Sequence, residues 1–167
     1  MNEEPAATPP FYIKPARTQR EFAVARGLFA AYATSLPVDL AYQDFNTEIA
    51  ALPGKYAPPM GELLLAWDAI DRPVACIGLR PFNEDKTCEM KRLYVAPEAR
   101  SFGLGKALTE AVIQAAKDKN YSFLRLDTLP NMITAAALYQ RMGFRRIAAY
   151  YGPTPAGTIF MELDLTR

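Results

Sequence analysis

A glycine-containing turn between an apolar strand and an apolar helix constrains this sequence more than any other feature. The turn runs from Arg100 to Lys106 and follows the strand-like segment 88–95. Apolar residues recur at helical spacing after it, so we expect a helix that begins near Gly103. The first turn of a helix carries unpaired N–H groups, and glycine lets a ligand approach the backbone closely. The pattern therefore predicts an anion site, which Arg100 and Lys106 flank with positive charge.

Two common phosphate-binding motifs do not fit this turn. A P-loop aligned on its glycine–lysine pair would need glycine where Arg100 stands and a hydroxyl residue where Ala107 stands. A dinucleotide-binding motif that starts at Gly103 would need its third glycine at Leu108. These mismatches disfavour a nucleotide-phosphate binder.

The turn does fit Arg/Gln-x-x-Gly-x-Gly/Ala, and the sequence resembles the GCN5-related N-acetyltransferase (GNAT) superfamily, where this motif binds the pyrophosphate of acyl-CoA. Residues Ala137 to Phe144 are similar to a second family motif, Leu-Tyr-x-x-x-Gly-Phe. The resemblance implies an α/β, or mixed α+β, fold with a splayed mixed sheet of about seven strands and about four flanking helices. We expect one such domain over residues 11–167, after a flexible leader over residues 1–10.

The local patterns give the expected elements. Alternation and turn residues predict strands over residues 11–15, 62–67, 73–79, 88–95, 123–127, 144–149 and 158–165. Helical spacing predicts one helix that starts at a capping box of Thr18 and Glu21 and stops before Pro37, a short helix around 44–52, the helix after the glycine turn, and a helix over 134–142. Asn120 suits the end of the third of these helices.

Composition excludes several classes of function. The chain has 19 basic and 18 acidic residues and a net charge of +1, so we expect no nucleic-acid partner and no membrane surface. It contains no histidine, which excludes a Ser-His-Asp triad, a Cys-His dyad and a histidine-ligated zinc, and we expect no metal. Without a signal peptide or an apolar stretch of about 20 residues, a cytoplasmic location is expected. Cys76 and Cys88 are interpreted as small buried residues, with a cross-strand arrangement left open.

The resemblance implies how acetyl-CoA is bound. The whole turn would hold the pyrophosphate, namely Arg100, Ser101, Phe102, Gly103, Leu104, Gly105 and Lys106. The backbone of Leu93, Tyr94 and Val95 would pair with the pantetheine arm, and an N–H near Leu93 would polarise the thioester. The alternative is a turn that only begins the helix. One position departs from the family, because Met132 stands where many members have asparagine, with Asn131 one residue away.

Glu89 is the candidate general base, because it lies eleven residues before Arg100, where some family members have a catalytic glutamate. A carboxylate partly sheltered by apolar neighbours suits proton abstraction, directly or through water. Alternation would place two faces on this strand, one with Glu89, Lys91, Leu93 and Val95 and the other with Cys88, Met90, Arg92 and Tyr94. The alternative is that Glu89 only pairs with a lysine or arginine of a strand.

Tyr139, in the second motif, is the candidate acid for the leaving thiolate; the alternative is a core aromatic packed on Leu138 and Met142. Aromatic residues on nearby loops are candidates for substrate contacts, or else for ordinary packing: Tyr42, Phe45, Tyr150 and Tyr151.

Together these features predict an N-acetyltransferase that moves an acetyl group from acetyl-CoA directly to a primary amine. The amine belongs to a small molecule or to a peptide or protein, and the sequence does not choose between them. A non-catalytic acyl-CoA-binding module or sensor is the alternative. The resemblance also leaves a homodimer open, because many family members dimerise.

Overall fold

The computed structural model describes residues 10–167, so the leader expected over residues 1–10 lies almost wholly outside the described residues. Seven strands form one mixed sheet in the order β1-β2-β3-β4-β5-β7-β6. The strands are β1 (Phe11–Pro15), β2 (Glu62–Asp68), β3 (Pro73–Pro81), β4 (Thr87–Val95), β5 (Phe123–Thr128), β6 (Arg145–Ile147) and β7 (Ile159–Asp164). The helices are α1 (Gln19–Ser35), α2 (Phe45–Ala50), α3 (Leu104–Asp118) and α4 (Ile133–Arg141), with short 3₁₀ turns η1 (Leu40–Gln43), η2 (Gly54–Tyr56) and η3 (Pro97–Ala99). The predicted fold class is confirmed.

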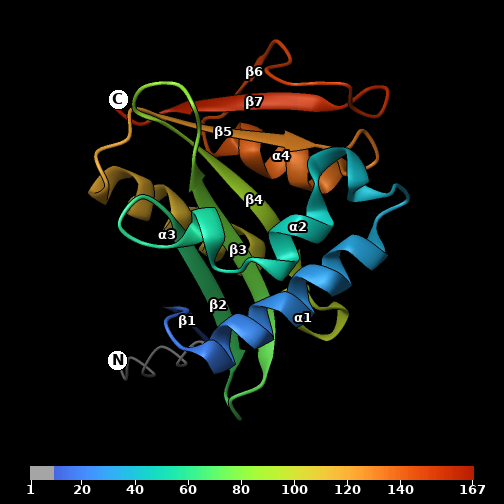
Figure 1. The fold of residues 1–167 in the computed structure, drawn as a ribbon, viewed down its shortest axis with the longest axis vertical. Helices are drawn as coiled ribbons and strands as arrows, with labels where there is room; N and C mark the ends of the chain where they lie inside the picture. Colours follow the sequence, from blue (N-terminus) through green and yellow to red (C-terminus); the bar gives the residue numbers. More distant parts are fainter. Residues whose placement is uncertain (1–9) are drawn as a thin grey trace, which may run out of the picture.

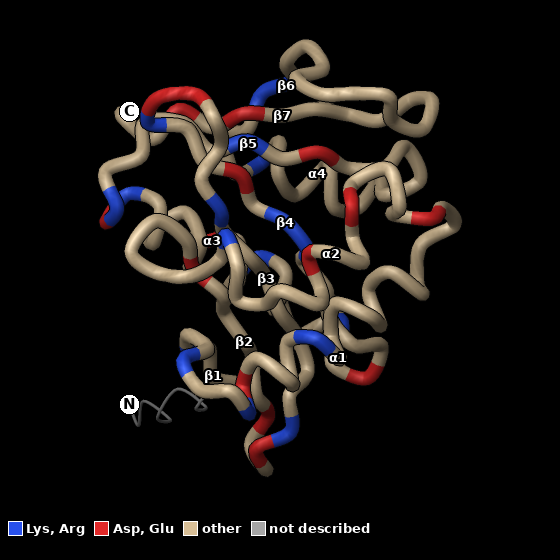
Figure 2. The backbone as a smooth tube through the Cα atoms, in the orientation of Figure 1, with Lys and Arg blue, Asp and Glu red and all other residues tan. Residues whose placement is uncertain are grey.

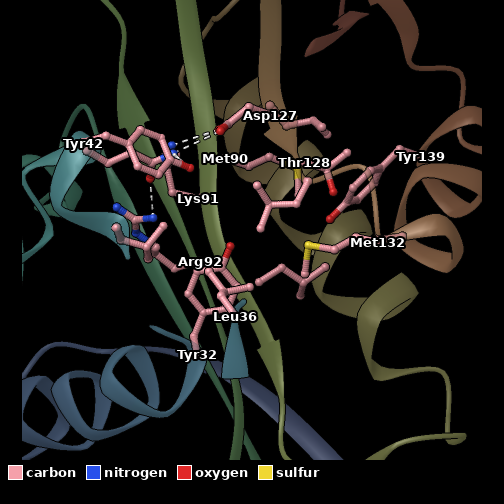
Figure 3. Close-up of a pocket in the computed structure, with 16 residues that line it drawn as sticks. Tyr32, Leu36, Tyr42, Met90, Lys91, Arg92, Asp127, Thr128, Met132 and Tyr139 are labelled. Atoms are coloured by element: carbon pink, nitrogen blue, oxygen red, sulfur yellow. Dashed lines mark hydrogen bonds and ion pairs between the residues drawn. The ribbon is translucent and has the colours of Figure 1, made fainter. Parts of the chain in front are cut away.

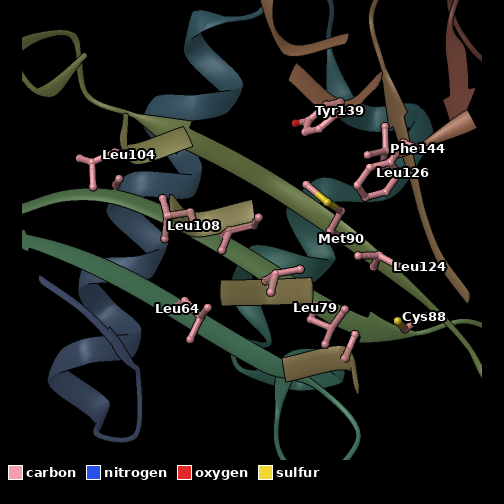
Figure 4. Packing of buried hydrophobic residues seen from close by; sticks show 14 of the residues in the cluster. Leu64, Leu79, Cys88, Met90, Leu104, Leu108, Leu124, Leu126, Tyr139 and Phe144 are labelled. Atoms are coloured by element: carbon pink, nitrogen blue, oxygen red, sulfur yellow. The ribbon is translucent and has the colours of Figure 1, made fainter. Parts of the chain in front are cut away.

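Helices cover both faces of the sheet (Figure 1). Helices α3 and α4 pack on one face, where Leu104, Leu108 and Tyr139 join sheet residues in one apolar cluster (Figure 4). Helices α1 and α2 pack on the other face, where Phe29 and Phe45 belong to a second cluster. Each face of the sheet therefore has its own hydrophobic core, and the side chains of the sheet contribute to both cores.

Helix boundaries follow the expected capping signals. Thr18 and Glu21 form a complete capping box at the start of α1. Asn120 lies just past the end of α3 with a φ of 64°, the left-handed conformation that ends a helix. Within residues 10–167, no helix is long and apolar enough to cross a membrane. Cys76 and Cys88 are both buried and free, and they do not oppose each other, since in the pairing of β3 with β4 Cys76 lies opposite Tyr94 and Cys88 lies opposite Pro81.

The sheet opens between β4 and β5. These two strands are parallel and pair only from Thr87 to Glu89, opposite Phe123 to Arg125. Beyond Glu89 they diverge, and in the described part of the chain no strand fills the gap. The divergence leaves one edge of β4 without a partner strand at the centre of the molecule.

A bulge in β4 changes which side chains share a face. The register with β3 shifts between Cys76 and Gly78, and Arg92 has a left-handed φ of 63°. Strict alternation was therefore the wrong prediction beyond Lys91. Arg92 lies with Glu89 and Lys91 on the α1/α2 side, whereas Leu93 and Val95 pack into the α3/α4 cluster. The extra residue at the bulge exchanges the two faces.

Candidate active site

A pocket lies where β4 and β5 diverge. Figure 3 shows Lys91 and Arg92 on one side of it and Tyr139 and Met132 on the other. Leu93, Asp127 and Thr128 also line it, together with residues of α1 and η1. The pocket therefore connects the two faces of the sheet, with an apolar side toward α4 and a charged side toward η1.

The glycine turn leads from the end of β4 into α3. Gly103 caps the helix with a φ of 78°, and no side chain caps it, so the N–H groups of the first turn are available to an anion. A Cβ added at Gly105 would meet only Leu138, at 3.9 Å. Packing within the protein therefore does not require glycine at position 105. The surface beside Gly105 is open, so a ligand can approach the backbone there. Lys106 lies 3.8 Å from Glu110 on the exposed side of the helix.

The free edge of β4 presents backbone groups to the gap. The N–H of Ala96 donates to Val74 on β3, so the groups of Val95 point the opposite way by alternation along the strand. The carbonyl of Val95 accepts instead from Nε of Arg100, at 3.0 Å. Leu93, two residues earlier, has the same orientation. A chain laid along this edge would find the peptide groups of Leu93 and Val95 facing it.

Tyr139 reaches the same pocket from α4. It is buried, packs against Phe144 with ring centroids 5.7 Å apart, and lines the pocket beside Thr128. Burial raises the pKa of Tyr139 well above its usual value, so the hydroxyl is protonated at neutral pH. It is thus a core aromatic whose protonated hydroxyl lies at the pocket wall.

Glu89 is in a different environment from the one predicted. Its Oε1 accepts from Nε of Arg80 at 3.0 Å, and its Oε2 accepts from the hydroxyl of Tyr150 at 2.6 Å. The expected apolar shelter is therefore wrong, since the neighbours of this buried carboxylate are a guanidinium, a phenol and the Lys91 ammonium, whose Nζ lies 4.0 Å from Oε2. The pairing with a strand arginine and lysine, which was the alternative, is present. Glu89 also does not line the pocket that holds Tyr139. Tyr150 does not line the pocket either, so a proton from the pocket would reach Glu89 through water or past Lys91, whose Nζ lies 4.0 Å from Oε2 of Glu89.

The carboxylate that does line the pocket is Asp127. Its Oδ1 accepts from Lys91 Nζ at 3.0 Å, while its Oδ2 accepts from the Tyr151 hydroxyl at 2.6 Å and from Gln43 Nε2 at 3.0 Å. Burial favours the neutral acid, but the charge of Lys91 and these hydrogen bonds outweigh it and lower the pKa of Asp127. A negative charge is therefore fixed at the pocket wall.

Arg92, at the bulge of β4, binds two residues of the segment that connects α1 to β2. Its guanidinium donates to both carboxylate oxygens of Glu48, at 2.9 and 3.1 Å, and to the side-chain oxygen of Gln43. Arg80 also reaches Glu48, at 3.4 Å. Figure 2 shows basic positions of β4 near an acidic position of α2. The network thereby holds Gln43 in place, and Gln43 in turn contacts Asp127.

The predicted substrate residues have different surroundings. Tyr42 lines the pocket, Tyr151 binds Asp127, and Tyr150 binds Glu89. Phe45 does not line the pocket; it is buried beneath Arg92, whose guanidinium lies 5.1 Å from its ring centroid. Packing, not substrate contact, accounts for Phe45. Met132 lines the pocket at the start of α4.

Sequence reasoning gave no role to Asp127, Lys91, Gln43 or Glu48. One signal was present, because Asp127 lies near the end of a short strand, where it alternates with Leu126 and Leu124 and so shares a face with Arg125. A charged residue there, at the carboxyl end of a strand parallel to β4, lies at the opening of the sheet. No local pattern marks Gln43 or Glu48.

Known proteins of similar sequence and fold belong to one enzyme family. The sequence model of the Acetyltransferase (GNAT) family matches residues 27–144. An uncharacterized N-acetyltransferase of Schizosaccharomyces pombe is 35% identical over 140 residues, which cover 84% of this chain and 86% of that protein.

Solved structures have the same arrangement. A putative acyl-CoA N-acyltransferase from Klebsiella pneumoniae superposes with a TM-score of 0.71 at 25% identity, covering 93% of this chain and 97% of the other. A GNAT family acetyltransferase from Elizabethkingia anophelis, with acetyl-CoA bound, has a TM-score of 0.63 at 22% identity over 94% of this chain and 99% of its own. At 22% identity, the similarity to the second structure shows a shared fold alone.

Proposed function

Because this chain belongs to the GNAT acetyltransferase family and is an acyltransferase, we propose that it moves an acetyl group from acetyl-CoA directly to a primary amine. One observation carries the proposal. The uncapped glycine turn of α3, the free edge of β4 and the hydroxyl of Tyr139 follow one another toward a single pocket. Those are the three contacts that the pyrophosphate, the pantetheine arm and the sulfur of acetyl-CoA require.

The donor would lie along this path. The pyrophosphate would bind the N–H groups of the turn from Arg100 to Lys106, where the helix dipole also favours negative charge. The pantetheine amides would pair with the peptide groups of Leu93 and Val95, as an added strand does. Acetyl-CoA bound to the Elizabethkingia anophelis relative supports this choice of donor.

The chemistry then needs few groups. The acceptor ammonium loses one proton, its nitrogen attacks the thioester carbon, the N–C bond forms and the C–S bond breaks. An N–H near Leu93 would stabilise the oxyanion, and Tyr139 would protonate the leaving thiolate. The nitrogen gives up its second proton to solvent, and solvent returns a proton to Tyr139. Glu89 would take the first proton through water or Lys91, because neither Glu89 nor Tyr150 lines the pocket and Lys91 does.

The cysteines support direct transfer. Burial raises the pKa of Cys88 to about 12, and burial also raises that of Cys76 well above its usual value. Thiols of this kind are not nucleophiles at neutral pH, because the thiolate is the reactive form. An acetyl-enzyme intermediate on either residue is therefore disfavoured.

The test is release of free CoA thiol from acetyl-CoA with a library of amines, with mass spectrometry of the products. Calorimetry with acetyl-CoA, ATP and NAD checks the donor. We expect acetyl-CoA alone to bind and at least one amine to gain an acetyl group. Binding without turnover of any amine would indicate the acyl-CoA-binding module, and binding of ATP or NAD in its place would contradict the assignment of the turn.

A further inference from the structure

We propose that the acceptor is a free α-amino acid with an uncharged side chain, and that the ion pair of Lys91 and Asp127, here called the 91–127 pair, binds its carboxylate and its ammonium. The inference rests on the proposed function and names the class of acceptor for that same pocket. It comes from the position of the pair, from its unused hydrogen-bonding capacity and from the charge balance around it.

The pair spans the opening of the sheet. The last residues paired between β4 and β5 are Glu89 and Arg125, and Lys91 and Asp127 each lie two residues further along. Where the strands diverge, these side chains meet across the gap with Nζ and Oδ1 3.0 Å apart. Both face the pocket that Tyr139 also lines. An acceptor amine bound at Asp127 therefore enters the same pocket as the thioester.

The two partners retain capacity for a ligand. Among residues 10–167, Lys91 makes one hydrogen bond, to Asp127, and its Nζ lies 4.0 Å from Oε2 of Glu89, although an ammonium has three donors. Asp127 accepts from three groups, Lys91, Tyr151 and Gln43, although a carboxylate offers about four lone-pair sites. By contrast, Arg92 uses its guanidinium on Glu48 and Gln43. Lys91 is therefore the cation available to a ligand carboxylate.

Charge balance selects a zwitterion. Three basic side chains, Arg80, Lys91 and Arg92, neutralise three acidic ones, Glu48, Glu89 and Asp127. Lys91 and Asp127 are only 3% and 8% exposed in their side chains, so an unbalanced ligand charge there would be poorly solvated. A simple amine enters as a cation and leaves an excess positive charge. An α-amino acid brings one charge of each sign.

The separation of the charges selects the α position. Because Nζ and Oδ1 are only 3.0 Å apart, a ligand must present its ammonium and carboxylate side by side to contact both. An α-amino acid carries them on one carbon. The remaining wall, with Tyr32, Leu36 and Met132, suits an apolar side chain, and a charged side chain would have no counter-ion of its own.

The experiment compares matched acceptors on the unaltered protein. Leucine is tested against 3-methylbutylamine, which lacks only the carboxylate, and against 6-aminohexanoate, whose two charges are far apart. We expect kcat/KM for leucine to exceed that for either by at least about tenfold, which corresponds to about 1.4 kcal/mol. We also expect 4-methylpentanoate, which lacks the amine and brings one unbalanced charge, to bind more weakly than leucine.

Variants assign the preference to the pair. Lys91→Met should reduce the leucine to 3-methylbutylamine ratio toward one, Lys91→Arg should keep most of it, and the control Lys117→Met, on the exposed side of α3, should leave it unchanged. Equal turnover of leucine and 3-methylbutylamine by the unaltered protein would overturn this inference and leave the acetyltransferase proposal standing. Failure to acetylate any amine would overturn both.

Discussion

Replacing Gly105 by alanine should separate the stability of the fold from the binding of the donor. Gly105 is the second residue of α3, and the added Cβ would meet only Cδ2 of Leu138, at 3.9 Å, an ordinary contact. The protein itself therefore gains from the change. Alanine in a helix is favoured over glycine by about 0.5–1 kcal/mol, which for a chain of this size raises Tm by about 1–4 °C.

Donor binding should change in the opposite direction. The Cβ would stand on the open surface of the helix start, where the pyrophosphate is proposed to approach the backbone. Loss of one hydrogen bond to a charged group costs about 1.5–3 kcal/mol, which is a roughly 10- to 100-fold rise in the Kd of acetyl-CoA. Thermal unfolding and calorimetry with acetyl-CoA measure the two effects on the same sample.

Two other glycines make the comparison specific. Gly27 lies within α1, where an added Cβ meets nothing within 4 Å, so Gly27→Ala should stabilise the protein and leave the Kd unchanged. Gly103→Ala should destabilise it by about 1 kcal/mol, because residue 103 has a φ of 78°. If Gly105→Ala binds acetyl-CoA with the Kd of the Gly27→Ala control, the pyrophosphate does not lie against this turn.

Four further outcomes follow from the pocket. Tyr139→Phe should lower kcat roughly 100-fold with little change in the Kd of acetyl-CoA, and an equal loss of turnover and of binding would make Tyr139 a packing residue. Because burial raises the pKa of Tyr139, the unaltered enzyme should lose no activity through ionisation of this hydroxyl below about pH 10. Glu89→Gln should lower the rate at neutral pH more than it weakens acetyl-CoA binding, and an unchanged pH–rate profile would exclude it as the base. Arg92→Met should cost about 3–5 kcal/mol in urea unfolding, and the double variant with Glu48→Gln should lose less than the sum; additive losses would contradict the pairing. Because the pKa of Asp127 is lowered in the folded protein, its ionised carboxylate stabilises the fold at pH above the ordinary value of 3.8, and this stability is lost as the pH falls through the lower folded value. Asp127→Asn should therefore flatten the acid limb of a curve of unfolding free energy against pH.

The elements that local signals specify could be predicted from the sequence. The strand before the glycine turn was expected over residues 88–95 and runs from Thr87 to Val95, and α3 starts at Leu104, next to the predicted Gly103. The capping box of Thr18 and Glu21 involves residues three apart, so short-range chemistry alone determines it. The donor side of the pocket belongs to this class, because its turn, strand edge and tyrosine each have a local pattern.

The charged side of the pocket could not be predicted in the same way. Arg92 occupies a bulge, and a single left-handed residue exchanges the faces of β4 without any glycine to mark it. Its partner Glu48 is 44 positions away in the sequence, and Lys91 meets Asp127 across 36 positions. Pairings of this range depend on where the sheet opens. Glu89 shows the consequence, since its strand was correct and its surroundings were not.

Buried charges of this kind are better explained by recognition than by stability. Burial of an ion pair costs several kcal/mol per ion in lost hydration, and apolar residues of similar volume often do as well or better. Elsewhere the sheet packs on apolar residues such as Leu64, Ile77 and Leu79, which carry no such cost. The buried charges gather at the one place where β4 and β5 separate, and the 91–127 pair bridges that gap with donors unused. A fixed pair of opposite charges is already oriented when a zwitterion arrives, so little reorganisation is needed to exchange partners. If the acceptor is the proposed α-amino acid, its selection, more than stabilisation of the sheet, accounts for the position of the pair.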